Sequence, residues 1–466
     1  MTPAPVAIVG GGAAGTLLAL HLVRRHGIPV TLYDGSGAFG RGLAYSATSP
    51  WHRLNVPAVK MGGWQADDPD AFSRWLAARD GATPASAAGR YAARADYGEW
   101  LSGLLAETVA QGGARLERVN AVALAPDAGA GWQLHLADGR RQACQAVALC
   151  QGNAAPRALP GTSGHPRCVN HPWQSRALAG VDADDHVLIA GSGASGLDSV
   201  LELLYTGHRG PIHLISRRAL LPRPDALPEP GTELGDPLAG LTATTPATLR
   251  VLFRTVRASL QQTWLAGQSW QPLMDAVLRQ ADARWDGLTL ADRRRFLRHV
   301  RAYWMVFRHR ADPAALRRLH SAEAQGQLRR VAARVDMLTA RAGGLRVELR
   351  HAGRGLPALD VDWVVNATGP DERVARRADP LLTQLLRDGL ARPGPLGLGL
   401  DVTAAGAVRD AAGDVGGALY ALGLPTRGTF WEVTSVPALR ARAAPLAALL
   451  ADRVGAANGR ARRPAA

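Results

Sequence analysis

The stretch that decides the fold is VAIVGGGAAGTLLALHLVRRHGIPVTLYD, residues 6–34. An apolar run at its start and another near its end predict two buried strands, and residues 16–26 between them predict a helix. Three glycines in GxGxxG spacing precede the helix: Gly10, Gly12 and Gly15. In a βαβ unit the first glycine permits a tight turn, the second lets a pyrophosphate approach the backbone, and the third lets the helix pack on the strand. The stretch therefore predicts a dinucleotide-binding site.

The end of the second predicted strand carries an acidic residue, Asp34. A carboxylate at this place can accept hydrogen bonds from the ribose of a dinucleotide. The pyrophosphate would lie at the N-terminus of the helix, where free N–H groups and the helix dipole favour an anion. The alternative is a glycine-rich surface loop, which does not explain two strands, a helix and an acid in register.

The same pattern occurs a second time. An apolar run at residues 187–190 leads into a loop whose predicted coenzyme-binding residues are Gly191, Ser192, Gly193 and Gly196. A helix and a strand follow, and this strand ends in Ser216-Arg217-Arg218 without an acid. Because guanidinium groups chelate a 2′-phosphate that a carboxylate would repel, the second site is predicted to bind NADPH through Arg217 and Arg218. The alternative, two exposed arginines in an arginine-rich protein, stays open.

Each of these units is followed by a similar stretch. Residues 114–152 and 328–369 alternate as hairpin-like strands, and each stretch ends in a strand that closes on a glycine, Gly152 or Gly369. The chain therefore contains two halves of one design, and the usual pair of dinucleotides in such a protein is FAD and a nicotinamide coenzyme. We predict an α/β fold with two Rossmann-like dinucleotide-binding domains, which is the architecture of glutathione reductase.

The domain boundaries follow from this repetition. Residues 1–165 and 370–455 are predicted to form a discontinuous FAD-binding domain, and residues 166–369 the NAD(P)H-binding domain. Residues 222–327 are predicted to be a helical insertion in the second domain, opened by a proline-rich linker, and residues 456–466 a disordered tail. An apolar stripe in the insertion predicts an amphipathic helix with a core-facing side: Phe296, Val300, Trp304 and Phe307. The insertion is the expected source of substrate specificity.

The composition narrows the possible functions. The chain has 54 basic and 39 acidic residues, a net charge of +15, but only one lysine, Lys60, and its arginines are scattered. Nucleic-acid binding is therefore disfavoured, because base-stacking surfaces need basic residues interleaved with aromatic ones. The three cysteines form no CxxC, and no histidine cluster has metal-ligand spacing, so neither a redox dithiol nor a metal site is predicted. The uncharged run at residues 6–23 is interpreted as strand and helix, not as a membrane span, which favours a cytoplasmic protein.

Several motifs resemble those of one group of proteins. The chain resembles bacterial FAD/NAD(P)-binding proteins related to the class B flavin-dependent monooxygenases, which include the flavin-containing monooxygenases and the N-hydroxylases of lysine and ornithine. The motifs that carry the resemblance are Gly40-Arg-Gly-Leu-Ala-Tyr45, His52-Arg-Leu-Asn-Val-Pro57, Arg94-Ala-Asp-Tyr-Gly98, Gly191–Asp198, Asn366-Ala-Thr-Gly369 and Ala421–Thr434.

The resemblance implies an activity and further site residues. It implies an FAD-dependent, NADPH-using monooxygenase that oxygenates nitrogen, sulfur or a carbonyl carbon of a small molecule with O2, through a flavin C4a-(hydro)peroxide. Asn55 corresponds to an asparagine that faces the flavin in flavin-containing monooxygenases, although an Asn before Val-Pro is also a common turn residue. Gly423, Thr429 and Thr434 belong to a segment similar to the second FAD-binding segment of the family.

Some features depart from the family. Leu424 follows Gly423 where many flavoproteins have Asp. The hallmark motif of flavin-containing monooxygenases is not literally present, and residues that include Gly161 and His165 match it only loosely. Two alternatives therefore remain: an NAD(P)H-dependent flavin oxidoreductase without oxygenation, and a flavoprotein with an RNA-binding or assembly role. The substrate and the oligomeric state also remain open, a homodimer included.

Overall fold

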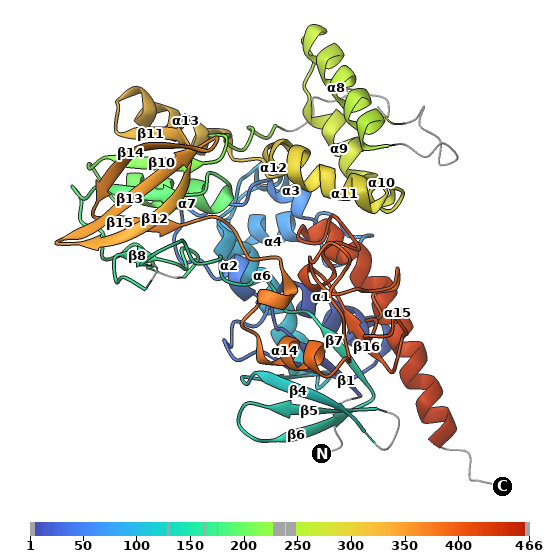
Figure 1. The fold of residues 1–466 in the computed structure, drawn as a ribbon. Helices are drawn as coiled ribbons and strands as arrows, with labels where there is room; N and C mark the ends of the chain where they lie inside the picture. The colour runs from blue at the N-terminus through green and yellow to red at the C-terminus, as the bar shows by residue number, and fades with distance from the viewer. Residues whose placement is uncertain are drawn as a thin grey trace.

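The computed structural model describes residues 5–127, 131–162, 164–174, 176–226, 238 and 248–461. In this part of the chain, two five-stranded parallel sheets form the centres of two halves, and a three-stranded antiparallel sheet accompanies each of them (Figure 1). The predicted α/β fold with two Rossmann-like units is therefore confirmed.

The first parallel sheet has the strand order β16-β7-β1-β2-β3. Its strands are β1 (Val6–Val9), β2 (Val30–Tyr33), β3 (Ala114–Glu117), β7 (Ala146–Leu149) and β16 (Leu419–Ala421). Successive side chains of a strand point to opposite faces, so Val6 and Ile8 of β1 join one core cluster while Ala7 and Val9 join another. Because β1 lies between β2 and β7, the strand order reverses at its carboxyl end, which is where open α/β sheets bind ligands.

The second parallel sheet repeats this arrangement with the order β11-β10-β9-β15-β8. Its strands are β8 (Cys168–Val169), β9 (Val187–Ala190), β10 (Ile212–Ser216), β11 (Leu328–Ala332) and β15 (Trp363–Asn366). The central strand β9 is buried throughout and pairs with β10 on one side and β15 on the other. Its carboxyl end is again a switch point, and Gly191 follows it directly.

The antiparallel sheets correct one part of the prediction. We expected hairpin-like strands throughout residues 114–152 and 328–369, but the first strand of each stretch, β3 or β11, joins the parallel sheet as its edge strand. Edge strands are half-exposed, so their alternating pattern cannot be told from that of a hairpin strand. The next three strands form the antiparallel sheets: β4 (Ala121–Pro126), β5 (Trp132–Leu136) and β6 (Arg141–Cys144), and β12 (Arg334–Arg341), β13 (Gly344–His351) and β14 (Arg354–Val361).

A helix follows each glycine loop, and a second one precedes the edge strand β3 or β11. The loop helices are α1 (Ala13–Leu20), prolonged by the π-helical turn η1 (His21–Arg25), and α7 (Ala194–Tyr205). The crossover helices are α6 (Arg94–Ala110) and α13 (Pro313–Ala324). Helix α13 falls within the predicted insertion, but it packs on α7 and β11 as part of the second half.

Further helices lie in the long connections between β2 and β3 and between β10 and β11. In the first half these are α2 (Gly42–Tyr45), α3 (Ala58–Met61), α4 (Ala71–Asp80) and α5 (Pro84–Ala88). In the second half they are α8 (Leu249–Leu265), α9 (Gln271–Arg279), α10 (Ala281–Asp286), α11 (Leu290–Arg295), the π-helical η2 (Phe296–Val300) and α12 (Arg301–Arg308). The stripe predicted to face the core does so: Phe296 is buried against Trp285, with Val300 and Trp304 packed on the same cluster. The fourth stripe residue, Phe307, packs on a neighbouring cluster.

The C-terminal segment returns to the first half. It contains η3 (Val374–Arg376), α14 (Pro380–Arg387), β16, η4 (Leu424–Thr426) and the final helix α15 (Val436–Ala461), which packs along α1 (Figure 1). We predicted a disordered tail from Ala456, but α15 continues to Ala461, and residues 462–466 lie outside the described part. Most of the predicted proline-rich linker, residues 227–237, also lies outside it. Among the described helices, none is both long and apolar enough to cross a membrane.

Candidate functional site

Both glycine loops begin with a residue that must be glycine. Gly10 has a φ of +109°, and a Cβ there would lie 2.5 Å from the carbonyl oxygen of Cys150, which follows β7. Gly191 repeats this geometry with a φ of +117° and a distance of 2.1 Å to the carbonyl oxygen of Ala367. A side chain at either position would therefore be strained by the backbone conformation and would also collide with the neighbouring strand.

The third glycine of each loop lets the helix approach the turn. A Cβ at Gly15 would lie 2.0 Å from the Gly10 carbonyl oxygen, and a Cβ at Gly196 would lie 1.9 Å from the Gly191 carbonyl oxygen. These contacts agree with the packing role that the spacing predicted. The two halves thus build the same turn from sequences that share an apolar strand, the three glycines and one alanine, Ala13 or Ala194.

The middle glycine of each loop is the N-cap of its helix. Gly12 and Gly193 have no side chain that could cap the helix. Neither α1 nor α7 has an acidic residue in its first turn. The first N–H groups of both helices are thus left for an anion. A Cβ at Gly193 would meet nothing within 4 Å, whereas one at Gly12 would lie 3.2 Å from the Cα of Gly42. The second loop is therefore open, and the first is bordered by the Gly40–Gly42 segment.

Asp34 lies beside the first loop, as predicted. One of its carboxylate oxygens accepts a hydrogen bond from the Gly11 N–H at 2.8 Å, and the other accepts from the N–H and hydroxyl of Ser36 at 3.0 and 2.6 Å. A carboxylate has about four acceptor sites, so these contacts leave capacity for a ribose hydroxyl. The geometry fits a dinucleotide whose pyrophosphate lies at α1.

The second loop differs in its polar side chains. Ser192 is buried, and its hydroxyl lies 2.7 Å from that of Ser216 and donates to the Leu220 carbonyl oxygen at 2.5 Å. Its side chain therefore ties the loop to the end of β10 and leaves only its backbone for a ligand. Arg217 and Arg218 are both exposed, and the Arg218 guanidinium lies 5.2 Å from the ring centre of Tyr303 in α12. Among the residues that the structure describes, no carboxylate forms an ion pair with either arginine.

The C-terminal segment predicted to contact FAD lies at the start of α1. Gly423 has a φ of +78°, and a Cβ there would lie 3.5 Å from the Ala14 Cβ. Thr429 is half-buried, and Thr434 is exposed just before α15. The structure thus brings Gly423 to the first glycine loop.

The helical insertion holds this C-terminal segment in place. In α10, one carboxylate oxygen of Asp282 accepts hydrogen bonds from the N–H groups of Trp431 and Glu432, at 2.7 and 2.9 Å. The Trp285 indole stacks on that of Trp431 at 4.7 Å and donates to the Gly428 carbonyl oxygen at 2.9 Å. An insertion that begins in the second half therefore closes over the segment that the first half contributes to the predicted flavin site.

Asn55 lies in the bend between residue 53 and α3, half-buried. Its segment is fixed by backbone contacts: the Leu54 N–H donates to the Ala92 carbonyl oxygen, and the Arg94 N–H donates to the His52 carbonyl oxygen, both at 2.8 Å. The position of Asn55 is therefore well defined by its neighbours. Its contact with flavin remains a prediction.

Sequence reasoning missed a group of basic side chains near this region. The pKa of His309, at the end of α12, lies far below its ordinary value because of burial and the charges of Arg308, Arg427, Arg94 and Arg301. Burial also raises the pKa of Tyr45 to about 12. No pattern in the sequence joins these residues, because they come from four separate segments.

A buried ion cluster joins the insertion to the first half. The only lysine of the chain, Lys60, lies 3.1 Å from both carboxylate oxygens of Asp225, whose side chain is fully buried. Arg310 contacts the same carboxylate at 2.8 Å and Asp275 at 2.6 Å. Removing one member would leave a buried charge without its partner, so the cluster fixes the insertion against α3.

The three cysteines are structural. Cys144, Cys150 and Cys168 are free and buried, and burial raises the pKa of each thiol, to about 12 for Cys144 and about 11 for Cys168. Buried thiols with raised pKa values are poor nucleophiles. The three cysteines of this chain therefore do not form the redox-active pair of a disulfide reductase.

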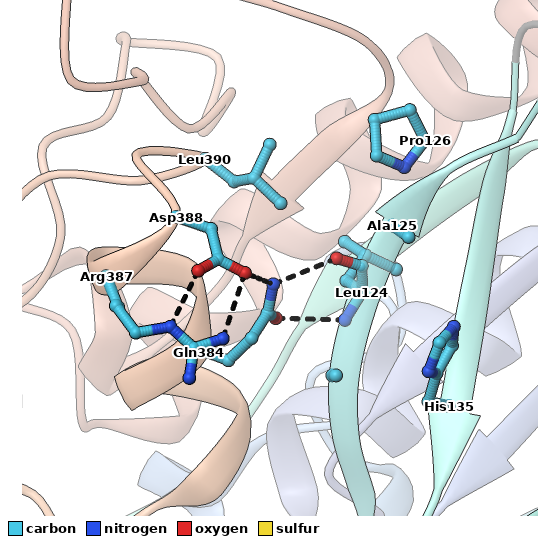
Figure 2. Close-up of a pocket in the computed structure, with 9 residues that line it drawn as sticks. Leu124, Ala125, Pro126, His135, Gln384, Arg387, Asp388 and Leu390 are labelled. Carbon is cyan, nitrogen blue, oxygen red and sulfur yellow. Dashed lines mark hydrogen bonds and ion pairs between the residues drawn. The ribbon is translucent and has the colours of Figure 1, made fainter.

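A surface pocket of about 400 Å³ lies away from both glycine loops, between β4, β5 and α14 (Figure 2). The Gln384 side chain accepts a hydrogen bond from the Leu124 N–H at 2.9 Å and donates to the Leu124 carbonyl oxygen at 3.1 Å. It thus pairs with edge strand β4 as another strand would. Arg387 and Asp388 form an ion pair at the rim. The polar side chains of this pocket therefore have structural roles, and we assign no ligand to it.

Comparison with known proteins agrees with this geometry. Residues 7–154 match the family described as FAD-NAD(P)-binding, and this part of the chain is therefore an FAD/NAD(P)-binding domain. No curated protein matches the sequence significantly.

Solved structures of flavoproteins share the fold over nearly the whole chain. The ornithine hydroxylase of Pseudomonas aeruginosa in its reduced form and the L-lysine 6-monooxygenase of Pseudomonas syringae each have 18% identity and a TM-score of 0.66, over 97% of this chain and 100% of theirs. The ornithine N-hydroxylase of Kutzneria sp. 744, with reduced FAD, NADP+ and L-ornithine, has 16% identity and a TM-score of 0.64, over 97% of this chain and 99% of its own. At these identities the similarity establishes the fold, that of flavoproteins with two dinucleotide-binding units.

Proposed function

We propose that this protein is an FAD-dependent, NADPH-using monooxygenase that acts on a small molecule. The observation that carries the proposal is the repeated glycine turn. Both halves have the same strained turn and the same uncapped helix N-terminus, but the first ends in Asp34 and the second in Arg217 and Arg218. The first is suited to the ribose of FAD and the second to the 2′-phosphate of NADPH.

The residues proposed to hold FAD are the first glycine loop, Asp34 and the segment from Gly423 to Thr434. The residues proposed to hold NADPH are the backbone of the second loop and the two arginines. Bound flavin would supply the redox chemistry, which comprises acceptance of hydride from NADPH and activation of O2 for oxygen transfer.

The protein's own task in such a reaction is to exclude water and orient the substrate. The contact of Trp285 with Trp431 closes the insertion over the predicted flavin segment. Arg308 and His309 lie at the end of α12, where the insertion faces that segment through the ion pair of Arg308 with Glu432 at 2.8 Å. We propose that the substrate binds between these elements.

Nitrogen oxygenation is the first chemistry to test, because three of the structures with this fold are named as hydroxylases or monooxygenases of ornithine or lysine. Disulfide reduction is not proposed, because the buried cysteines offer no redox pair. Unpaired thiols also fit a reducing compartment, so we propose a cytoplasmic location.

The test measures NADPH consumption and hydrogen peroxide release together, with amines such as ornithine and lysine, thioethers and ketones as candidate substrates. A substrate should raise NADPH consumption above the basal rate and lower the peroxide formed per NADPH, with a hydroxylated or oxygenated product in equal amount. If every compound leaves all reducing equivalents in peroxide while an electron acceptor is reduced, the protein is an oxidoreductase without oxygenation.

A further inference from the structure

One face of α7 contacts the first half of the molecule. Asp198, Glu202 and Tyr205 are spaced by four and three residues, so they lie on one side of the helix. Each of them has a partner from the first half. The helix that begins at the second glycine loop is therefore also the element that meets the predicted FAD-binding half.

The strongest of these contacts is an ion pair. An Arg94 guanidinium nitrogen lies 2.9 Å from a carboxylate oxygen of Asp198, and the two side chains are only 20% and 13% exposed. The Arg94 Nε–H also donates to the Arg53 carbonyl oxygen at 3.1 Å. Arg94 thus joins α7 to the chain segment that continues into Asn55.

Two weaker contacts continue along the same face. Glu202 accepts a hydrogen bond from the Ser49 hydroxyl and lies 3.6 Å from the Nε2 of His52. The Tyr205 ring stacks on Trp51, with ring centres 4.2 Å apart and planes inclined by 17°. Three neighbouring contacts fix both the separation of the two elements and their relative rotation, which a single ion pair could not do.

The positions of the two ends give this contact a functional meaning. Asp198 lies little more than one turn from the start of α7, where the coenzyme pyrophosphate is proposed to bind. The segment of residues 49–55 ends at Asn55, which is predicted to face the flavin. We propose that Arg94 and Asp198 are positioning residues that set the nicotinamide against the flavin for hydride transfer.

This inference rests on the proposed function, because it requires NADPH and FAD in the two sites. Hydride transfer depends steeply on geometry, and a displacement of about 1 Å can cost roughly a hundredfold in rate. Removing one partner of a poorly exposed ion pair leaves the other charge unpaired, so the contact would loosen. Neither residue is among those proposed to hold NADPH, and the Asp198 side chain pairs with Arg94, so coenzyme binding should change little.

The test is anaerobic reduction of the FAD-loaded protein by NADPH in a stopped-flow instrument. Asp198→Asn keeps the size of the side chain and removes its charge, and Asp198→Glu restores the charge. Arg94→Gln and Arg94→Lys form the same pair from the other side. Asp184→Asn is the matched control, because Asp184 forms an exposed pair with Arg209 at 2.7 Å in the same half.

We expect Asp198→Asn and Arg94→Gln to lower the limiting reduction rate about ten- to a hundredfold at saturating NADPH. The dissociation constant for NADP+ should stay close to that of the wild type, whereas the unpaired charge should lower the melting temperature by a few degrees. The conservative variants should recover most of the rate, and Asp184→Asn should show no change. The proposal is overturned if Asp198→Asn reduces at the wild-type rate, or if weaker NADP+ binding accounts for its whole defect. Failure of NADPH to reduce the wild-type flavin would instead contradict the proposed function.

Discussion

At the residue scale, two glycines of the second loop have different expected roles, one in ligand binding and the other in helix packing. Gly193→Ala adds a methyl group into open space, whereas Gly196→Ala adds one 1.9 Å from the Gly191 carbonyl oxygen. We expect Gly193→Ala to keep its melting temperature within a few degrees, because an N-cap Gly→Ala exchange costs about 1 kcal/mol or less. Its affinity for NADPH should fall at least about tenfold, because the methyl group lies where a pyrophosphate would approach.

Gly196→Ala is the matched variant for the packing role. Its methyl group forces α7 away from the turn, so thermal unfolding should occur at a clearly lower temperature. Isothermal titration with NADPH and a melting curve of each variant test both expectations. Unchanged coenzyme affinity in Gly193→Ala would show that the pyrophosphate does not lie at this loop.

The exposed arginines at the end of β10 predict coenzyme selectivity. Replacing Arg217 and Arg218 together with alanine removes two charge-assisted contacts to a 2′-phosphate, each worth about 1.5 kcal/mol or more. The Michaelis constant for NADPH should therefore rise about a hundredfold, while that for NADH stays nearly constant. Steady-state oxidation of the two coenzymes measures this, with Arg209→Ala as an exposed control in the same half. Equal effects on NADPH and NADH would refute phosphate recognition at these residues.

At the scale of elements, α10 is expected to seal the proposed site. Trp285→Phe keeps an aromatic ring against Trp431 but removes the hydrogen bond to the Gly428 carbonyl oxygen. The loss of one buried hydrogen bond costs about 1–3 kcal/mol, so the melting temperature should fall by several degrees. A looser insertion also admits water, and more hydrogen peroxide should form per NADPH consumed. Tight coupling in a destabilised Trp285→Phe protein would show that α10 does not seal the site.

The pairing of β9 and β10 predicts a response to acid. The His186 and His213 side chains share a hydrogen bond at 2.7 Å, and burial lowers the pKa of both, that of His213 to about 4. The unfolded chain therefore binds more protons than the folded one between pH ~6.5 and ~4, and stability falls as the pH falls through this range. The free energy of unfolding should drop by up to about 3 kcal/mol from this group.

Denaturant titrations at a series of pH values from ~7 to ~5 measure this effect. His213→Asn keeps a polar atom near the position of Nδ1 but cannot be protonated in this range, so its stability should vary less with pH. Replacing the exposed His351 with asparagine is the control. A pH dependence of His213→Asn equal to that of the wild type would contradict the assignment.

How far the sequence predicts these elements depends on how local their signals are. Strands such as residues 187–190 and turns such as Gly10 follow from apolar runs and glycine spacing, which are encoded within a few residues. The edge strands β3 and β11 were assigned to the wrong sheet, because their half-exposed pattern does not say which neighbour they pair with. The start of the tail at Ala456 was wrong because its composition did not reveal that α15 continues to Ala461.

At the scale of the whole molecule, the two halves are joined by contacts that no local pattern contains. The ion pair of Arg94 with Asp198 and the contacts of Asp282 with residues 431 and 432 each join segments more than a hundred residues apart. The motifs that carry the family resemblance contain Arg94 and Asp198, but the sequence does not show that these two residues contact each other. The ion pair between them is seen only in the folded structure, where the two halves meet.

The net charge of +15 also has a different meaning at this scale. Many arginines pair with carboxylates inside the molecule, as Arg310 does with Asp225 and Asp275, and as Arg308 does with Glu432. Arg217 and Arg218, which are exposed, have a candidate anion in the 2′-phosphate of NADPH. The excess charge therefore requires no nucleic-acid partner.

In the proposed reaction, NADPH in the second half reduces FAD in the first. The most direct measurement is the anaerobic reduction of the FAD-loaded protein by equal concentrations of NADPH and NADH, followed by flavin absorbance. We expect complete reduction by NADPH in one step, at least about tenfold faster than by NADH, since recognition of the 2′-phosphate is worth about 1.4 kcal/mol or more. Flavin that stays oxidised with NADPH, or that NADH reduces equally fast, would contradict it.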